Sequence, residues 1–276
     1  MLKAYEITPE QAQKLNPNNF TFEMKYDGFR SFWTGHKILS DRGIDNTYKF
    51  PQIAKTLNSF SDTFLDAEIY VKGGCVHDIN QKDNWKNAIM VVFDILRKDG
   101  KNITHKTLRD RRVALKEFFN EIKLPEKDTI EPTITFNSFK EGWDYITKNN
   151  LEGVMVKNLN STYHHNLNDI LKVYRVNSWK KCKNFKEGFE EIIGYNAGSI
   201  KGSFLLSNGG KISALSKDKV KEYYQLKEKG GKVFCEFMYL YKTNQNKYFQ
   251  PILKRLVGGE THSQNTKYGG RKSSFF

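Results

Sequence analysis

The sequence has few residues that could form disulfide bonds or bind a metal through a thiolate. Its 276 residues contain only three cysteines, Cys75, Cys182 and Cys235, which lie far apart and form no C-x-x-C pair. Neither a disulfide framework nor a thiolate zinc site is supported, and a reducing compartment is expected. The adjacent residues His164 and His165 have no spaced partner set, which favours a polar loop over metal ligation.

Long apolar runs are also missing, and the mean hydropathy is −0.67. We therefore expect a soluble chain with no membrane span. The first residues, MLKAYEITPEQAQKL, lack the apolar segment and small-residue cleavage site of a secretory signal. They instead predict a strand followed by a helix that begins at Thr8 and Pro9, so a cytoplasmic location is expected.

No phosphate-binding loop of the usual kind is present. The chain has 20 glycines but no G-x-x-x-x-G-K-[ST] segment, which argues against a P-loop mechanism. It also has no internal repeat, low-complexity tract, zinc finger or helix-hairpin-helix module. A nucleotide, if one binds, has to be held in another way.

Positive charge is what the chain has in excess. Lys and Arg number 45 against 31 Asp and Glu, which gives a net charge of +14 and a pI of about 9.4. Residues 201–276 hold fifteen basic and five acidic side chains, so +10 lies there and only +4 on the first 200 residues. Such a surface is typical of proteins that meet polyanions, although lysines that only confer solubility would give the same composition.

The first 186 residues alternate short β-type runs with helical ones, which predicts an α+β domain. The predicted strands cover residues 21–26, 64–71, 87–96, 133–136 and 152–157, and the predicted helices cover residues 50–60, 107–122 and 138–149.

From residue 187 the sequence pattern changes to short β-type runs separated by Gly, Asn and Ser. One helix is predicted there, at residues 217–229. About five short strands with a single inserted helix favour a small β-barrel of the OB-fold type over residues 187–260. The polar, Gly-rich and basic residues 261–276 are predicted to form a flexible tail.

Residues 23–30 read EMKYDGFR, which suits both a hairpin and a catalytic centre, and we predict a hairpin that holds the nucleophile. Asp27 and Gly28 form a dipeptide that often turns one strand into the next. On a strand, Lys25 and Asp27 would project from the same face, with Arg30 beyond the turn. A lysine can act as a nucleophile, and an arginine can hold phosphate oxygens.

A nucleophilic Lys25 has to lose its proton first. Because the ordinary pKa of lysine lies far above 7, the neutral amine costs roughly 4 to 5 kcal/mol at neutral pH. The carboxylate of Asp27 raises that cost, so cations, either basic side chains or a divalent metal, are required nearby. The remaining sequence must therefore supply carboxylates for a metal and further Lys or Arg for phosphates.

Predicted strands supply both kinds of group. Glu68 and Glu152 are the candidate carboxylates, and Lys181 and Lys183 share one strand face with Trp179. Each of these residues alone would usually be a solvated side chain. Their joint presence is what favours a site.

In order and spacing, six segments resemble the ATP-dependent DNA ligases of the covalent nucleotidyltransferase superfamily, especially the compact viral and phage enzymes. KYDGFR resembles K-x-D-G-x-R, FLDAEI resembles L-D-G-E, and VVFDIL resembles F-D-I-L. EGVMVK resembles E-G-x-M-x-K, WKKCK resembles W-x-K-x-K, and EEIIGY resembles the start of the OB domain. The resemblance spans residues 20–260 and implies a nucleotidyltransferase (ATP-grasp-like) domain, residues 1–186, followed by an OB-fold domain.

The resemblance also implies roles for individual residues. Lys25 would accept AMP from ATP through a phosphoramide bond, with Glu23 near the adenine and Phe93 stacked on it. The residues expected to bind the nucleotide are Glu23, Tyr26, Arg30, Glu68, Phe93, Lys181 and Lys183. Glu152, together with Glu68, would hold Mg²⁺ or Mn²⁺. The residues expected to contact nucleic acid are Arg42, Arg175, Lys254 and Arg255.

The chain departs from the family pattern in three places. Ala67 stands where the family usually has Gly, and Lys180 and Cys182 replace aliphatic residues between the motif lysines. After Arg255 the chain continues through Leu256 and Val257 to Gly258-Gly259-Glu260 instead of completing the final R-x-D-K motif. The residues that would orient pyrophosphate therefore have no assignment.

The reaction implied is the sealing of nicks in duplex DNA by a monomer, through lysyl-AMP and adenylated DNA. An RNA ligase and an mRNA capping guanylyltransferase of the same superfamily are alternatives, and a non-catalytic basic DNA-binding protein is a third. The resemblance to compact enzymes also suggests a virus- or phage-encoded protein.

Overall fold

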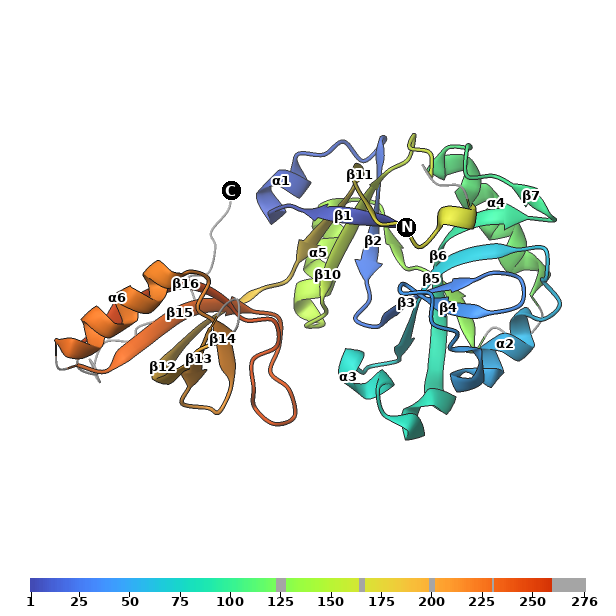
Figure 1. The fold of residues 1–276 in the computed structure, drawn as a ribbon. Helices are drawn as coiled ribbons and strands as arrows, with labels where there is room; N and C mark the ends of the chain where they lie inside the picture. The colour runs from blue at the N-terminus through green and yellow to red at the C-terminus, as the bar shows by residue number, and fades with distance from the viewer. Residues whose placement is uncertain (123–127, 164–166, 199–201, 230, 260–276) are drawn as a thin grey trace. The chain divides into compact units, whose positions relative to one another are not determined.

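The computed structural model describes residues 1–122, 128–163, 167–198, 202–229 and 231–259. The chain forms two compact units, residues 1–184 and 185–276, and each is described by itself (Figure 1). The predicted tail at residues 261–276 and the pair His164 and His165 lie outside the described residues. No helix within the described ranges is long and apolar enough to cross a membrane.

The first unit contains two β-sheets, and one of them has five strands. Its strands are β1 (Leu2–Glu6), β2 (Phe20–Lys25), β9 (Thr135–Phe136), β10 (Gly153–Asn158) and β11 (Tyr174–Lys183). Their order in the sheet is β1-β11-β10-β2-β9, with β1 parallel to β11 and β10 antiparallel to both of its neighbours. Helix α1 (Pro9–Gln13) begins at the predicted position, where Thr8 caps it, and α5 (Phe139–Lys148) packs on β2 and β10.

The other sheet of this unit has six strands. They are β3 (Phe29–Trp33), β4 (Ile38–Ser40), β5 (Phe64–Val71), β6 (Ala88–Lys98), β7 (Lys101–Asn102) and β8 (Ile130–Pro132). The order is β4-β3-β5-β6-β7, and β8 pairs with β6 in parallel. The helices that accompany this sheet are α2 (Pro51–Leu57), α3 (Val76–Ile79) and α4 (Leu108–Glu121). Strands β5 and β6 are buried along most of their length, and most of their residues are apolar on both faces.

The segment between β2 and β3 is a crossover between the two sheets. Lys25 ends β2 and Phe29 begins β3, but these strands do not pair with each other. The hairpin predicted at Asp27 and Gly28 is therefore wrong. A Cβ on Gly28 would lie 2.2 Å from the carbonyl oxygen of Ile69, so this position needs glycine because the chain passes directly against the backbone of β5.

The predicted strand at residues 133–136 is also a crossover. Only Thr135 and Phe136 are in β9, which pairs with β2, whereas the preceding strand β8 pairs with β6 in the other sheet. The backbone N–H of Ile134 donates to the hydroxyl of Tyr26 at 3.1 Å. This second crossover therefore lies beside the first.

A shared core joins the two sheets of the first unit. Leu2 and Trp179 from the five-stranded sheet are buried in one cluster with Phe32, Phe64 and Leu96 from the six-stranded sheet. The sheets therefore face each other through large apolar side chains, and side chains from both can line one pocket.

The second unit contains one antiparallel sheet of five strands. Its elements are β12 (Lys186–Asn196), β13 (Ser203–Leu206), β14 (Lys211–Ser213), α6 (Lys217–Glu228), β15 (Val233–Tyr239) and β16 (Ile252–Gly258). The strand order is β14-β13-β12-β15-β16, and β14 also contacts β16. Ser216 caps α6, and Tyr223 of that helix is buried against Phe204 in the core of the unit.

The first unit also buries charged groups. Arg111 on α4 donates to both carboxylate oxygens of Asp94 on β6, at 2.8 and 2.7 Å, and both side chains are fully buried. Arg111 also donates to the backbone oxygen of Lys106 at 2.7 Å. Because each charge is compensated by the other, removing only one of them leaves a buried, unpaired ion.

Replacing Asp94 with Ala should lower the free energy of unfolding by about 3 to 5 kcal/mol, because Arg111 loses its counter-ion inside the core. Urea denaturation at neutral pH measures this change. The control is Asp144→Ala, which breaks the exposed Lys140–Asp144 pair and should cost less than about 1 kcal/mol. Replacing both partners, Asp94→Leu with Arg111→Met, should recover most of the loss; equal losses in the single and double variants would contradict this account.

Candidate active site

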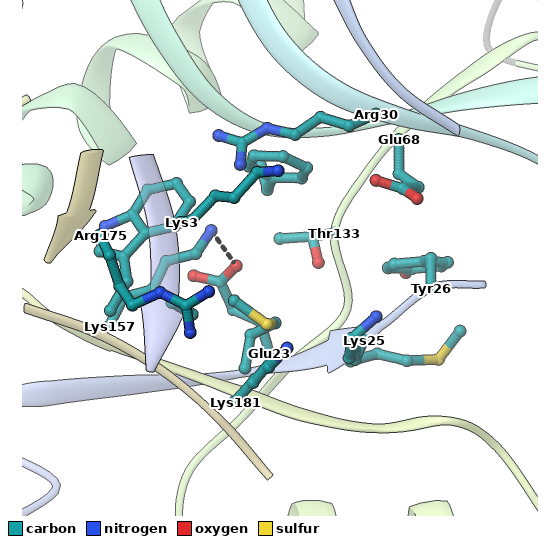
Figure 2. Close-up of a pocket in the computed structure, with 15 residues that line it drawn as sticks. Lys3, Glu23, Lys25, Tyr26, Arg30, Glu68, Thr133, Lys157, Arg175 and Lys181 are labelled. Carbon is teal, nitrogen blue, oxygen red and sulfur yellow. Dashed lines mark ion pairs between the residues drawn. The ribbon is translucent and has the colours of Figure 1, made fainter. Parts of the chain in front are cut away.

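A pocket of about 210 Å³ lies between the two sheets of the first unit, and Figure 2 shows the side chains that line it. These residues come from β1, β2, β3, β5, β6, β10 and β11 and from the crossovers before β3 and β9. They are Lys3, Ala4, Glu23, Met24, Lys25, Tyr26, Arg30, Glu68, Phe93, Thr133, Met155, Lys157, Arg175, Trp179 and Lys181. The structure therefore brings seven of the predicted nucleotide and catalytic residues, together with Arg175, to one hollow.

Lys25 and Glu152 form an ion pair at one end of this pocket. The antiparallel register of β2 and β10 sets Gly153 opposite Lys25, and the Nζ of Lys25 donates to Oε2 of Glu152 at 2.6 Å. A Cβ on Gly153 would lie 2.1 Å from the carbonyl oxygen of Cys182 on β11. A glycine at this position therefore lets β11 approach and keeps Glu152 at the start of β10.

The charge on Lys25 is stabilised in this arrangement. Burial lowers the pKa of Lys25, but the carboxylates of Glu152 and Glu68 outweigh that effect and raise it above the ordinary value, and Asp27 adds a smaller contribution. We predicted that Asp27 would be the carboxylate opposing proton loss; the structure shows that Glu152 and Glu68 contribute more. Asp27 instead accepts from the backbone N–H of Val76 at 3.3 Å.

Glu68 has an unusual protonation equilibrium. Burial raises the pKa of Glu68 from 4.5 to about 8, with Lys25 acting against this shift and Glu152 reinforcing it. Lys25 is shared by Glu152 and Glu68, and Arg30, whose charge also acts on Glu68, is already paired with Asp66. An excess of negative charge therefore remains when both glutamates are ionised. That excess is the electrostatic condition in which a divalent cation binds well.

The described residues contain no group of three or more His, Cys, Asp or Glu side chains placed to hold a metal ion. Mg²⁺ usually keeps several waters and binds through one or two carboxylates together with substrate phosphates. Glu152 and Glu68 fit that mode, because both face Lys25 and leave the other coordination positions to phosphate and water.

An aromatic and cationic wall forms another part of the pocket. The Nζ of Lys157 lies 4.2 Å from the ring centroids of both Phe93 and Trp179 and pairs with Oε2 of Glu23 at 2.8 Å. Arg112 on α4 pairs with the other oxygen of Glu23. Burial lowers the pKa of Lys157 even though Glu23 opposes the shift. Met155 lines the pocket as well, so the wall offers Phe93 and Met155 to a flat ligand.

Arg30 is fixed rigidly beside this wall. Its guanidinium donates to both oxygens of Asp66, at 2.9 and 2.6 Å, and to the backbone oxygen of Leu2. The hydroxyl of Tyr163 donates to the same carboxylate at 2.8 Å. The guanidinium carbon also lies 5.4 Å from the ring centroid of Phe93. Arg30 therefore presents a preorganised positive charge to the pocket.

Further cations surround the pocket. Lys3 on β1 and Arg175 on β11 are register partners, and both line the pocket together with Lys181. The Nζ of Lys181 lies 3.6 Å from a carboxylate oxygen of Glu6. Lys183 is not among the lining residues, but its pKa depends on charges at the pocket. Burial lowers the pKa of Lys183, and the positive charges of Lys181 and Lys25 lower it further.

Three predicted nucleic-acid residues are not among those that line the pocket. Arg42 is exposed in the turn after β4, where its backbone N–H donates to Ser40 Oγ at 3.3 Å. Lys254 and Arg255 belong to β16 of the second unit. Both are ion-paired, Lys254 with Glu187 at 2.7 Å and Arg255 with Glu236 through both of its carboxylate oxygens.

The predictions from sequence missed several residues of the pocket. Lys157 ends the EGVMVK segment but received no role, although its place in that motif was a usable signal. Arg112 and Lys3 carried no local signal, because one lies on an amphipathic helix and the other on a short terminal strand. Thr133 lies in the segment that was predicted as a strand.

Residues 1–183 match the protein family described as ATP dependent DNA ligase domain. The chain therefore belongs to that family, as its motifs indicated. This match covers the six-stranded and five-stranded sheets and the whole of the pocket.

Individual relatives agree with this membership. The chain is 28% identical over 208 residues to the bifunctional non-homologous end joining protein LigD of Bacillus subtilis, covering 63% of this chain and 33% of that protein. It is 31% identical over 219 residues to the SPbeta prophage-derived DNA ligase-like protein LigB of the same organism, covering 73% and 74%. The chain thus spans about a third of the length of LigD and about three quarters of the length of LigB.

A solved structure shares the fold. A mycobacterial DNA ligase D complexed with ATP and MES superposes with a TM-score of 0.57 at 20% identity, covering 94% of this chain and 95% of that one. The predicted α+β nucleotidyltransferase class of the first unit is confirmed at this level.

The raised pKa of Glu68 predicts a pH-dependent loss of stability in buffer without metal or nucleotide. Between about pH 4.5, the ordinary carboxyl pKa, and about pH 8, the Glu68 side chain binds fewer protons in the unfolded chain than in the folded one. The free energy of unfolding therefore falls as the pH rises through this range, and it levels off above about pH 8. Urea denaturation should show the wild type losing at least about 1 kcal/mol more than Glu68→Gln between about pH 5.5 and about pH 8.5. Glu228→Gln, at an exposed position on α6, should retain the wild-type dependence; parallel curves for Glu68→Gln and wild type would refute the assignment.

Proposed function

We propose that the chain is an ATP-dependent DNA ligase that seals 3′-OH/5′-phosphate nicks in duplex DNA through lysyl-AMP and adenylated DNA. The observation that carries this proposal is the Lys25–Glu152 ion pair at 2.6 Å, in the pocket of a unit that belongs to the ligase family. A lysine held by a carboxylate, with aromatic and cationic groups around it, suits covalent capture of a nucleotide.

Lys25 is the proposed nucleophile. Its Nζ attacks the α-phosphorus of ATP, a P–N bond forms, the bond to the bridging oxygen breaks, and pyrophosphate leaves. The lysine must give up its proton, and Glu152 is the acceptor that already contacts it. Mg²⁺ or Mn²⁺ held by Glu152 and Glu68 would neutralise phosphate charge when bound. The cations around the pocket supply the remaining stabilisation, since phosphoryl transfer depends mainly on positioning and charge neutralisation.

The nucleotide would lie across the pocket. Adenine would stack on Phe93, with Met155 on its opposite side and Glu23 accepting from its amine. Arg30 and Glu68 would contact the ribose, and Tyr26 would close the pocket beside the crossover. Lys181 and Lys183 would contact the α-phosphate and the leaving pyrophosphate. This placement is supported by the buried Glu23–Lys157 pair, which holds the acceptor at the aromatic wall.

We infer that the second unit is an OB-fold domain spanning residues 187–260, after a nucleotidyltransferase domain at residues 1–186. The support is its strand order, with the first strand between the second and fourth, its helix between the third and fourth strands, and the contact of the third strand with the fifth.

The substrate we propose is nicked duplex DNA, bound by a monomer in the cytoplasm. Arg42, Arg175, Lys254 and Arg255 would contact its backbone, and the +10 charge of residues 201–276 would add sequence-independent affinity. A phage or viral source would fit the prophage-derived relative LigB.

Labelling with radioactive ATP tests the proposal. In Mg²⁺, the wild type should take up a covalent AMP label that nicked DNA removes as the nick is sealed. Lys25→Arg keeps the positive charge beside Glu152 but has no nucleophilic amine, so labelling should fall by at least about 1,000-fold. Lys140→Arg, at an exposed position on α5, should label as the wild type does. Label from GTP alone would identify a capping enzyme, sealing of RNA alone would identify an RNA ligase, and no label in the wild type would leave a DNA-binding protein.

A further inference from the structure

A second aromatic surface lies on the first unit, formed by two short 3₁₀ helices at residues Thr47–Lys49 and Lys82–Asn87. The ring of Tyr48, which is 71% exposed, meets the indole of Trp85 edge to face, with centroids 6.2 Å apart. The Nζ of Lys49 lies 5.7 Å from the Tyr48 centroid and 5.4 Å from that of Trp85. None of these residues lines the nucleotide pocket.

This surface borders a hollow of about 480 Å³, to which Lys82 and Lys86 also contribute. Tyr48 lines a second hollow of about 500 Å³ together with Lys55. The tyrosine ring is therefore accessible from both hollows.

The surface is held rigid from behind. The indole N–H of Trp85 donates to the backbone oxygen of Ile79 at 3.0 Å. The amide of Gln52 donates to the backbone oxygens of Trp85 and Ala88 at 2.6 and 3.1 Å. The Trp85 ring also packs on Phe50 in the core. These contacts fix Trp85, so a base stacking on Tyr48 would not have to order the platform beneath it.

The charge on this surface is uncompensated. Among the residues that the structure describes, neither Lys49 nor Lys82 nor Lys86 forms an ion pair with a carboxylate. The acidic residues in or beside these segments are Asp83, which is exposed, and Asp45, which pairs with Lys37 at 3.3 Å. An exposed aromatic ring among unneutralised lysines suits a flexible polyanion with π-faces, because bases can stack while phosphates meet the lysines.

We propose that this Tyr48–Trp85 surface binds a single-stranded extension of the DNA substrate, with one base stacked on Tyr48 and phosphates on Lys82 and Lys86. The inference rests on the proposed function for the identity of the substrate. A duplex keeps its bases stacked on each other and cannot offer a free base face to Tyr48. The turn that carries Arg42 leads directly into the segment that carries Tyr48, so both residues belong to one connection between β4 and α2.

Fluorescence anisotropy without ATP tests this surface, using labelled oligothymidylate, a flush-ended nicked duplex, and the same duplex with an oligothymidylate extension. Tyr48→Ala should weaken binding of oligothymidylate and of the extended duplex about ten-fold, while the flush-ended duplex binds as before. Tyr224→Ala, at another exposed tyrosine in the second unit, is the matched control. Equal weakening for all three DNAs, or no weakening for any, would overturn the proposal.

The salt dependence provides a second measurement. Replacing both Lys82 and Lys86 with Ala should lower the slope of log affinity against log salt by about 1.4 for oligothymidylate, since each phosphate contact to a single strand contributes about 0.7. Lys116→Ala, at an exposed position on α4, should leave the slope unchanged. An unchanged slope in the double variant would also overturn the proposal.

AMP labelling of the same variants separates this inference from the proposed function. Tyr48→Ala should take up AMP as the wild type does, because Tyr48 lies outside the nucleotide pocket. A wild type that takes up no AMP but binds the extension through Tyr48 would refute the ligase and support this surface. A wild type that seals nicks while Tyr48→Ala binds every DNA normally would do the reverse.

Discussion

The ion pair between Lys25 and Glu152 is the interaction on which the rest of the site depends. It exists because β2 and β10 pair in one register, which sets Gly153 opposite Lys25, and because a glycine there lets β11 pass within contact of the same strand. The pair holds the lysine at the end of the pocket but also keeps it protonated. The proposed nucleophile is therefore held in position while it is still protonated.

Other charged groups around the pocket are fixed as well. Glu68 is buried near a lysine that is already paired, so its own ionisation is disfavoured. Arg30 and Lys157 are each fixed by a buried carboxylate, and both lie against aromatic rings. Buried ion pairs contribute little to stability compared with apolar packing. Their value here is that cations and acceptors stand in fixed positions around an apolar wall, where a charged nucleotide can be held without reorganisation.

The sequence predicted much of this site because its chemistry is carried by short strand motifs. Lys25, Glu68, Phe93 and Lys181 lie within those motifs, and all four reach the pocket. The hairpin at Asp27 and Gly28 was predicted wrongly because a turn dipeptide indicates a reversal locally, whereas strand partners are set by distant residues.

Local sequence patterns likewise could not predict the contacts between distant segments. Arg112 meets Glu23 only because α4 packs on β6, and Lys3 reaches the pocket only because β1 pairs with β11. Lys254 and Arg255 could be assigned to a basic surface, but their carboxylate partners could not be predicted. Arg255 meets Glu236 because β16 pairs with β15 in one register, and Lys254 meets Glu187 of β12. Sequence therefore identified the charged groups that reach the pocket better than it identified the residues that hold them.

The central claim is that Lys25, held by Glu152, is the residue that receives AMP. Its most direct test is to incubate the wild-type protein with ATP and Mg²⁺, digest it, and locate the AMP adduct by peptide mass spectrometry. The account predicts one adduct, on the peptide that contains Lys25 and on that side chain. An adduct on Lys157, Lys181 or Lys183 instead would contradict it.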